Sequence, residues 1–229
     1  MINQIHLVRN TYPGLLFVFE GIDFCGKSTE IIRMRNWLGA HVGVDKVLET
    51  KEPTKSRFGL QIRKILGDKD LFLTTDPFDL QELFAKDGRL HMEGEVVPRL
   101  VQGHVVCSDR WRTSMVYGMT RGSLIELHML MEMNELNLRE YLVCPDKTFI
   151  FDVPPEMAIE RGKTSGRSFD QMEKLETLTA VRENYAILAK EYPELNCVLV
   201  DATRSVEEIF VDVRNIVEES LKAKNFKLS

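Results

Sequence analysis

Eight consecutive residues have the types and the spacing needed to bind phosphate groups. From Gly21 to Ser28 the chain reads Gly-Ile-Asp-Phe-Cys-Gly-Lys-Ser, which fits the pattern G-x-x-x-x-G-K-[ST] without a mismatch. Backbone N–H groups around the glycines can surround an anion, and the helix that follows adds the positive end of its dipole. We expect Lys27 to reach the β- and γ-phosphates of ATP and Ser28 to bind Mg²⁺. The predicted ATP-binding residues are Gly21, Ile22, Asp23, Phe24, Cys25, Gly26, Lys27, Ser28 and Thr29.

Such a loop requires a buried strand before it and a helix after it, and the surrounding sequence predicts both. Short apolar runs predict strands at residues 15–20, 46–50, 105–109, 148–152 and 197–201. Helical periodicity between them predicts helices at residues 27–38, 59–66, 79–101, 124–141, 155–161, 171–190 and 206–223. Most of the strands are continuous apolar runs, so we expect a five-stranded parallel sheet flanked by helices on both faces. This is a three-layer α/β fold of the P-loop NTPase type, in which ligands bind at the carboxyl ends of the strands.

The composition is that of a globular protein. Of the 229 residues, 44% are apolar and 28% are charged, and no low-complexity stretch or Pro/Gly linker divides the chain. Acidic residues outnumber basic ones, 35 to 30, for a net charge of −5. This balance disfavours a nucleic-acid binder, because such proteins carry an excess of Lys and Arg. No apolar run reaches the ~18 residues that a membrane span requires.

The four cysteines form no metal-binding or disulfide pattern. Cys25, Cys107, Cys144 and Cys197 make no C-x-x-C pair, and no histidine lies at ligand spacing from them. Residues 1–14, which we expect to be an N-terminal extension, contain Asn, Gln, His and Arg in place of the apolar stretch of a signal peptide. We therefore expect a cytoplasmic protein with reduced thiols.

A phosphate loop alone does not say what is done with the nucleotide. GTPases usually carry an N-K-x-D motif, which this sequence lacks, and motor proteins need a longer chain to couple hydrolysis to movement. The simplest interpretation is a nucleotide or nucleoside kinase.

Several further segments resemble motifs of the thymidylate kinase (dTMP kinase) family, and they occur in the family's order. The first two are Phe19-Glu20-Gly21-Ile22-Asp23, similar to F-E-G-x-D, and Lys51-Glu52-Pro53-Thr54 with Gly59, Ile62 and Arg63, similar to R-E-P-T…G…I-R. The others are Asp109-Arg110-Trp111, similar to D-R-[YFW], then Phe151-Asp152-Val153-Pro154-Pro155-Glu156, similar to L-D-V-x-P-E, and finally Asp201-Ala202-Thr203. Together they cover about residues 15–215.

The resemblance implies a single P-loop kinase domain over residues 1–229, with a short lid at 161–170 and a tail at 224–229. It implies that ATP and dTMP give ADP and dTDP, with Mg²⁺ as cofactor. Because the acceptor is a phosphate whose second pKa is near 6, it needs no strong general base. Catalysis then depends on aligning two anions and neutralising charge on the transferred group. The family is dimeric, so we expect a homodimer. The apolar helix at 124–138 is either the seam of that dimer or part of the buried core.

The family's motifs also suggest roles for single residues. Arg110 would bridge the donor and acceptor phosphates, and Asp109 would organise Mg²⁺ through water. Arg63 would bind the acceptor phosphate, Asp23 the sugar 3′-hydroxyl, and Glu52 would shape the acceptor pocket.

The lid is expected to supply a catalytic cation. Some family members place an arginine directly after the loop carboxylate, where this chain has Phe24. Lid residues close over ATP and exclude water, so the missing charge should come from the lid. Arg167 is the first choice and Arg161 the second, beside Lys27 and Arg110 as the other catalytic residues.

The base pocket departs from the family in two places. The family pattern L-F-x-x-x-R places a phenylalanine on the base and an arginine at its edge; here Phe84 fits, but Gly88 stands at the arginine position and Arg89 follows one residue late. The family's aromatic residue nine positions after the aspartate is replaced by Gly118, with Tyr117 one place early. A one-residue slip in each helix would bring Arg89 and Tyr117 into the pocket, although a slip turns a side chain by about 100°. Otherwise the pocket reads another base, or the activity has been lost.

Two alternatives therefore stay open beside dTMP phosphorylation. The chain could phosphorylate another pyrimidine (deoxy)nucleoside monophosphate, or a deoxynucleoside with Glu20 or Glu52 as the base. It could also be a non-catalytic nucleotide-binding homologue.

Overall fold

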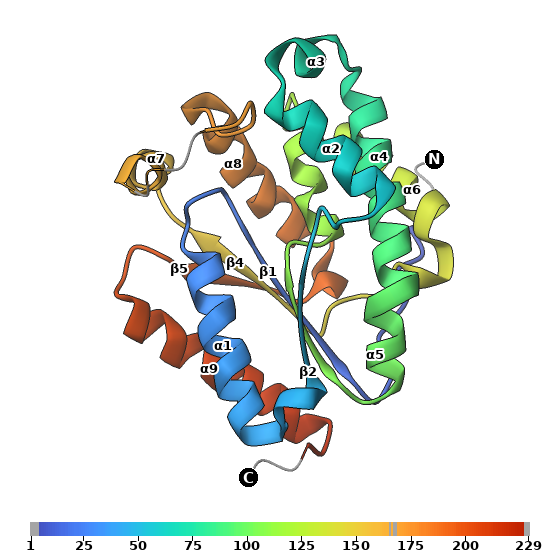
Figure 1. Cartoon of the computed structure of the whole chain (residues 1–229), viewed down its shortest axis with the longest axis vertical. Helices are drawn as coiled ribbons and strands as arrows, with labels where there is room; N and C mark the ends of the chain where they lie inside the picture. The colour runs from blue at the N-terminus through green and yellow to red at the C-terminus, as the bar shows by residue number, and fades with distance from the viewer. Residues whose placement is uncertain (1–4, 165, 167–168, 227–229) are drawn as a thin grey trace.

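Five parallel strands form one central sheet in the computed structural model, which describes residues 5–164, 166 and 169–226 (Figure 1). The strands are β1 Leu15–Gly21, β2 Val47–Lys51, β3 Val105–Asp109, β4 Lys147–Asp152 and β5 Cys197–Asp201. Their order is β2-β3-β1-β4-β5, and all neighbours are parallel. β1 lies at the centre and is buried throughout. The predicted parallel sheet is confirmed, and every strand bound agrees within one residue.

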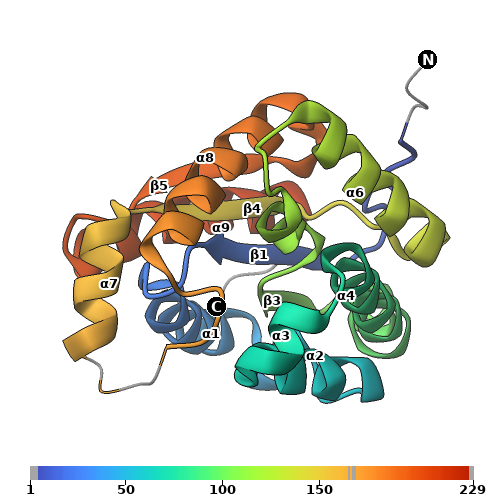
Figure 2. The ribbon, with the colours of Figure 1, turned by 90° about the horizontal axis from the view of Figure 1, so that it is seen from above.

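Helices cover both faces of this sheet, as the continuous apolar strands predicted. They are α1 Lys27–Val42, α2 Arg57–Gly67, α3 Lys69–Thr74, α4 Pro77–His91, α5 Val97–Val101, α6 Leu124–Leu138, α7 Pro155–Thr164, α8 Leu175–Glu191 and α9 Val206–Ala223. α1 packs against α9 on one face, while α6 and α8 lie on the opposite face (Figures 1 and 2). In the described part of the chain, no helix has both the length and the apolar character that crossing a membrane demands.

The clearest differences from the predicted helices lie at α3, at α5 and at the start of α8. The short helix α3 was not predicted; Asp68 begins it by accepting hydrogen bonds from the N–H groups of Asp70 and Leu71. The helix predicted at 79–101 is interrupted by a π-helical turn, Met92–Val96, directly before α5. Pro98 sits in the first turn of α5, where its missing N–H donor is tolerated. α8 begins at Leu175, later than the predicted start at residue 171.

The strand register places the chemistry at one edge of the sheet. Phe19 in β1 pairs with Asp109 at the end of β3, and Gly21 pairs with Phe151 near the end of β4. The loop after β1 and the residues after β3 therefore leave the sheet side by side. In Figure 1 this edge lies beneath α2, α3 and α7.

Candidate active site

The phosphate loop connects β1 to α1, as the motif predicted. Gly21 and Gly26 adopt φ angles of 135° and 101°, which glycine reaches without the steric clash of a Cβ atom. A Cβ at position 21 would also lie 2.7 Å from the carbonyl oxygen of Phe151. Among the described residues, no side chain caps the N-terminus of α1. An anion at this helix end therefore does not compete with a capping side chain.

Two cations converge on the carboxylate in this loop. Arg110 Nη2 donates a hydrogen bond to Asp23 Oδ1 over 2.8 Å, and Lys27 Nζ lies 3.7 Å from the same oxygen. The Tyr117 hydroxyl donates to Asp23 Oδ2 over 3.0 Å. Burial raises the pKa of the Asp23 carboxyl, but the charges of Arg110 and Lys27 outweigh it and hold the pKa well below its usual range. Asp23 is therefore ionised at neutral pH and balances cations that can bind phosphate.

A second carboxylate, Glu20, fixes the segment that carries Arg110. Arg110 has a φ of 71°, in the left-handed region, and its Nη1 donates to the carbonyl oxygen of Gly21 over 3.1 Å. Glu20 is fully buried in β1, and each of its oxygens accepts two hydrogen bonds. The donors are Trp111 N, Thr113 Oγ1, Ser114 Oγ and Tyr185 OH, at 2.6–2.9 Å. This carboxylate is fully occupied in holding the residues after β3, so it is not available as a base for an acceptor hydroxyl.

The predicted metal-binding pair lies at the junction of α1 and β3. Ser28 Oγ donates to Asp109 Oδ2 over 3.4 Å. Over the described ranges, no cluster of three His, Cys, Asp or Glu side chains could hold a metal by itself. One hydroxyl and one carboxylate nevertheless suit Mg²⁺, which prefers oxygen ligands and takes most of its shell from water and substrate phosphates.

A cavity of about 360 Å³ lies between this loop, α2 and α4. It brings together predicted site residues from separate segments of the chain: Asp23, Lys27, Ser28, Glu52, Arg63, Phe84, Asp109, Arg110 and Tyr117. Arg63, on α2, also donates a hydrogen bond to the carbonyl oxygen of Pro53. The cavity is therefore bounded by the cations Lys27, Arg63 and Arg110 and by the Phe84 and Tyr117 rings.

Arg112, which no sequence motif indicated, is a buried arginine behind the cavity wall. Its Nη2 forms an ion pair with Glu52 Oε2, and its Nη1 donates to the carbonyl oxygen of Phe84. His91 Nδ1 lies 2.9 Å from the other Glu52 oxygen. Burial lowers the pKa of Arg112 to about 10, and the charge of Glu20 opposes this only in part. Glu52 and the backbone of Phe84 are thus held by one guanidinium, and Glu52, like Glu20, is unavailable as a base.

Arg112 also explains the glycine at position 88. A Cβ on Gly88 would lie 2.4 Å from Arg112 Cζ, so no larger residue fits there while the guanidinium keeps its place. The predicted substitute, Arg89, does not reach the cavity. It pairs with Glu93 over 2.8 Å and lies over the Tyr141 ring at 4.2 Å. α4 is a regular helix around these residues. Arg89 lies five residues after Phe84 and not four, and this one-residue difference turns its side chain toward α6.

The beginning of the predicted lid contacts the phosphate loop. Arg161 Nη1 donates to the carbonyl oxygen of Cys25 over 3.4 Å, and its Nη2 donates to that of Ala202 over 3.0 Å. Phe24, in the loop, packs against Phe169 with ring centroids 5.0 Å apart. Arg167 lies outside the described residues.

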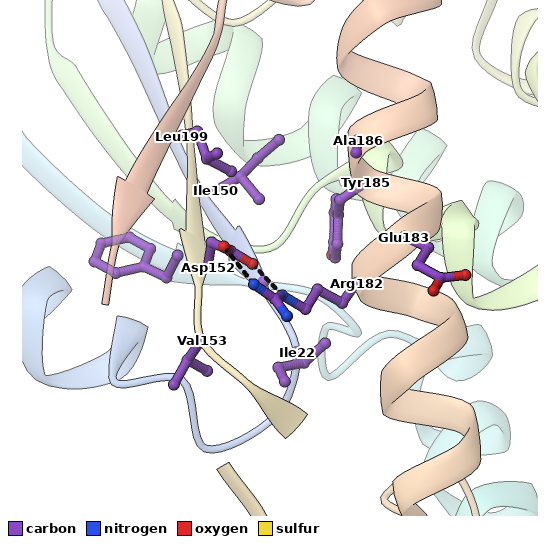
Figure 3. Close-up of a pocket in the computed structure, with 11 residues that line it drawn as sticks. Ile22, Ile150, Asp152, Val153, Arg182, Glu183, Tyr185, Ala186 and Leu199 are labelled. Carbon is purple, nitrogen blue, oxygen red and sulfur yellow. Dashed lines mark hydrogen bonds and ion pairs between the residues drawn. The ribbon is translucent and has the colours of Figure 1, made fainter. Parts of the chain in front are cut away.

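A smaller cavity, of about 250 Å³, lies beside the start of the loop, between β4 and α8 (Figure 3). Its walls are mostly apolar, and Figure 3 shows Arg182 reaching across it to Asp152. The two hydrogen bonds of this pair measure 2.5 and 2.8 Å. Because Asp152 neutralises Arg182, this cavity lacks the converging cations of the larger one.

Known proteins resemble this chain over most of its length. The family model described as thymidylate kinase matches residues 19–213. The thymidylate kinase of Dinoroseobacter shibae is 37% identical over 213 residues, covering 89% of this chain and 96% of that protein. The thymidylate kinase of Oleidesulfovibrio alaskensis is 34% identical over 221 residues, covering 90% and 98%. In fold, the chain is similar to the crystal structure of thymidylate kinase from Ehrlichia chaffeensis, with a TM-score of 0.66 at 23% identity over 90% of this chain and 98% of that one. The chain belongs to the thymidylate kinase family.

Proposed function

We propose that this protein is a thymidylate kinase that transfers the γ-phosphoryl group of ATP to dTMP, giving ADP and dTDP. The observation that carries the proposal is the convergence of Lys27 and Arg110 at a helix N-terminus without a side-chain cap, beside a cavity large enough for a nucleotide. In the reaction an oxygen of the acceptor phosphate bonds to the γ-phosphorus, and the bond from that phosphorus to the bridging oxygen of ADP breaks. Because both substrates are anions, cations between them are the main catalytic requirement.

We assign the donor side of the site to the loop Gly21–Ser28 and Thr29. Lys27 and the loop N–H groups bind the β- and γ-phosphates of ATP. Ser28 and Asp109 bind Mg²⁺, directly or through water, and the bound ion offsets the phosphate charge. The hydrogen bond between these two side chains supports a shared role.

The acceptor side is assigned to residues that line the same cavity. Arg110 lies between the two phosphates and Arg63 binds the acceptor phosphate, since both guanidinium groups border the cavity. Asp23 binds the sugar hydroxyl, and Phe84 stacks on the base. Tyr117 and Glu52 are positioning residues: Tyr117 orients Asp23, and Glu52 ties Arg112 to the wall of the cavity.

We further propose that residues 161–170 act as a lid that supplies a cation to the transferred phosphoryl group. Arg161 is already within hydrogen-bond distance of the loop backbone, and Arg167 stays the other candidate.

A homodimer is proposed from the surface of α6. This helix exposes Ile125 and Leu136, at 69% and 72% of their surface, and a paired helix would cover them. Sedimentation at micromolar concentration should give a mass near twice that of the chain. We also propose a cytoplasmic location, because all four cysteines are free thiols.

The test is ADP release by purified protein with Mg²⁺-ATP and a panel of acceptors: dTMP, dUMP, dCMP, CMP, UMP, AMP, GMP and thymidine. We expect dTMP to be the preferred acceptor and thymidine to give no turnover. Preference for another monophosphate would keep the mechanism and change the substrate. ATP binding without transfer to any acceptor would refute the enzyme and leave a nucleotide-binding homologue.

A further inference from the structure

A second pocket, of about 480 Å³, adjoins the acceptor cavity. Tyr117 and Met172 line both, so the two spaces meet at these side chains. The phosphate-binding groups Lys27 and Arg110 border only the first. A nucleotide whose phosphate meets Arg110 therefore has room to extend its other end past Tyr117 and Met172 into the second pocket.

Gln81 is the most buried polar side chain that lines this second pocket, with 6% of its surface exposed. It lies on α4 three residues before Phe84, so the two side chains share one face of the helix. Two other polar groups of the pocket already have partners: the Tyr117 hydroxyl donates to Asp23, and the Thr120 hydroxyl donates to Glu126. Within the described ranges, the Gln81 carboxamide has no hydrogen-bond partner. Neither amide atom of Gln81 is among the fully buried polar atoms that lack a partner in the described residues, so the carboxamide is accessible from the pocket and can bind a ligand or water.

The backbone opposite leaves space for this side chain. A Cβ on Gly118 would lie 2.7 Å from Gln81 Cδ and 2.9 Å from its Nε2. Gly118 is not among the described residues with positive φ, so its conformation does not itself demand glycine. A side chain at position 118 would therefore displace the Gln81 amide from its present place.

We propose that Gln81 reads the base of the acceptor nucleotide, and this inference rests on the proposed dTMP kinase activity. A carboxamide presents a donor, Nε2–H, and an acceptor, Oε1, side by side in one plane. Thymine and uracil present the complementary pair on one edge, the O4 acceptor and the N3–H donor. Gln81 donates to O4 and accepts from N3–H, while Phe84 stacks on the ring. It is therefore a specificity-determining residue supplied from α4, about two turns before the position where the family has its arginine.

Two substitutions of Gln81 separate recognition from packing. Gln81→Leu keeps the side-chain size and removes both hydrogen bonds, so the KM for dTMP should rise about 10- to 100-fold. Gln81→Glu keeps the shape but faces O4 with a carboxylate, so the ratio of kcat/KM for dTMP over dCMP should fall by a similar factor. The KM for ATP should not change in either variant, because Gln81 does not border the donor site. Gln102→Leu, at an exposed glutamine that ends α5, is the matched control.

A third variant tests the spatial argument. Gly118→Ala should displace the amide and raise the KM for dTMP, whereas Gly94→Ala, where a Cβ meets nothing within 4 Å, should not. Adding Gly118→Ala to Gln81→Leu should change the KM little further, because the hydrogen bonds are already gone.

The outcomes distinguish the two hypotheses. If the unmodified protein phosphorylates dTMP but both Gln81 variants, folded by circular dichroism, keep the dTMP/dCMP ratio and the KM of the Gln102 control, the proposed role of Gln81 is refuted. If the unmodified protein phosphorylates no acceptor, the proposed function fails and the role of Gln81 fails with it.

Discussion

Replacing Glu30 with glutamine should stabilise the protein by an amount that depends on pH. Glu30 lies in the first turns of α1, with 2% of its surface exposed, and neither carboxylate oxygen has a partner among the described residues. Burial raises the pKa of Glu30 to about 7; the charge of Arg33 opposes the rise, and that of Glu207 adds to it. The folded state therefore disfavours the ionised carboxylate.

The magnitude follows from proton linkage. Because the pKa is higher in the folded state than its ordinary value of 4.5, the folded protein holds a proton that the unfolded chain has lost. The contribution of Glu30 to the free energy of unfolding is complete below about pH 4.5 and is lost as the pH rises through about 7. At about 1.4 kcal/mol for each pKa unit the full loss would be about 3 kcal/mol, and screening by nearby solvent reduces it to about 2 kcal/mol. Glutamine is neutral at every pH, so the Glu30→Gln variant avoids this loss.

The assay is urea unfolding followed by tryptophan fluorescence, at about pH 5, 6, 7 and 8. The advantage of Glu30→Gln over the unmodified protein should be small at the lowest pH and grow to about 2 kcal/mol at the highest. Glu219→Gln, at an exposed carboxylate on α9, is the control and should show no such growth. If the difference in free energy of unfolding between Glu30→Gln and the unmodified protein stays constant across this pH range, the reasoning is refuted.

Three other substitutions test features of the site and its support. Gly88→Ala should displace the Arg112 guanidinium and break its buried ion pair with Glu52. The free energy of unfolding should then fall by about 3 kcal/mol, and a fall no larger than that of Gly94→Ala would contradict this. Asp109→Asn should raise the Mg²⁺ concentration for half-maximal ADP release about 10-fold, and an unchanged Mg²⁺ titration would exclude a metal role. Ser205→Ala removes the side-chain cap of α9 and should cost about 1 kcal/mol in urea unfolding without changing kcat; a change in kcat would show that this helix end is coupled to the site.

The sheet and the phosphate loop could be predicted because their signals are local. A buried strand needs a continuous apolar run, and a phosphate loop needs glycines at two fixed positions, where φ is positive. The start of α8 could not be predicted in this way. The Asp170 side chain accepts a hydrogen bond from the N–H of Met172, and the Glu173 side chain accepts one from the N–H of Asp170. These bonds form a turn in a segment whose helical periodicity predicts a helix. Side chains that capture backbone donors compete with helix formation, and periodicity does not record this.

The base pocket shows a second limit of sequence reasoning. A pattern along one helix identifies a vacant position at Gly88, but it does not show that Arg112 fills that space from another segment. The hypothesis that Arg89 replaces the missing arginine assumed a slip in the helix, and α4 does not slip. Glu20 was weighed as a base because it is acidic and lies beside the loop. The burial of Glu20 and its four hydrogen-bond donors depend on the tertiary structure. A charged residue inside an apolar strand was nevertheless a sequence signal that its carboxylate must be fully hydrogen-bonded.

The contact between Gly88 and Arg112 constrains how this sequence can change over time. An arginine at position 88 is incompatible with the present Arg112, and loss of Arg112 alone leaves Glu52 buried beside an empty space. Neither single replacement is neutral, so the two positions must change together or through an intermediate that tolerates the defect. In an alignment of relatives, large side chains at 88 should accompany small ones at 112. Ancestral reconstructions that treat the two columns as independent would then pass through proteins that do not fold well.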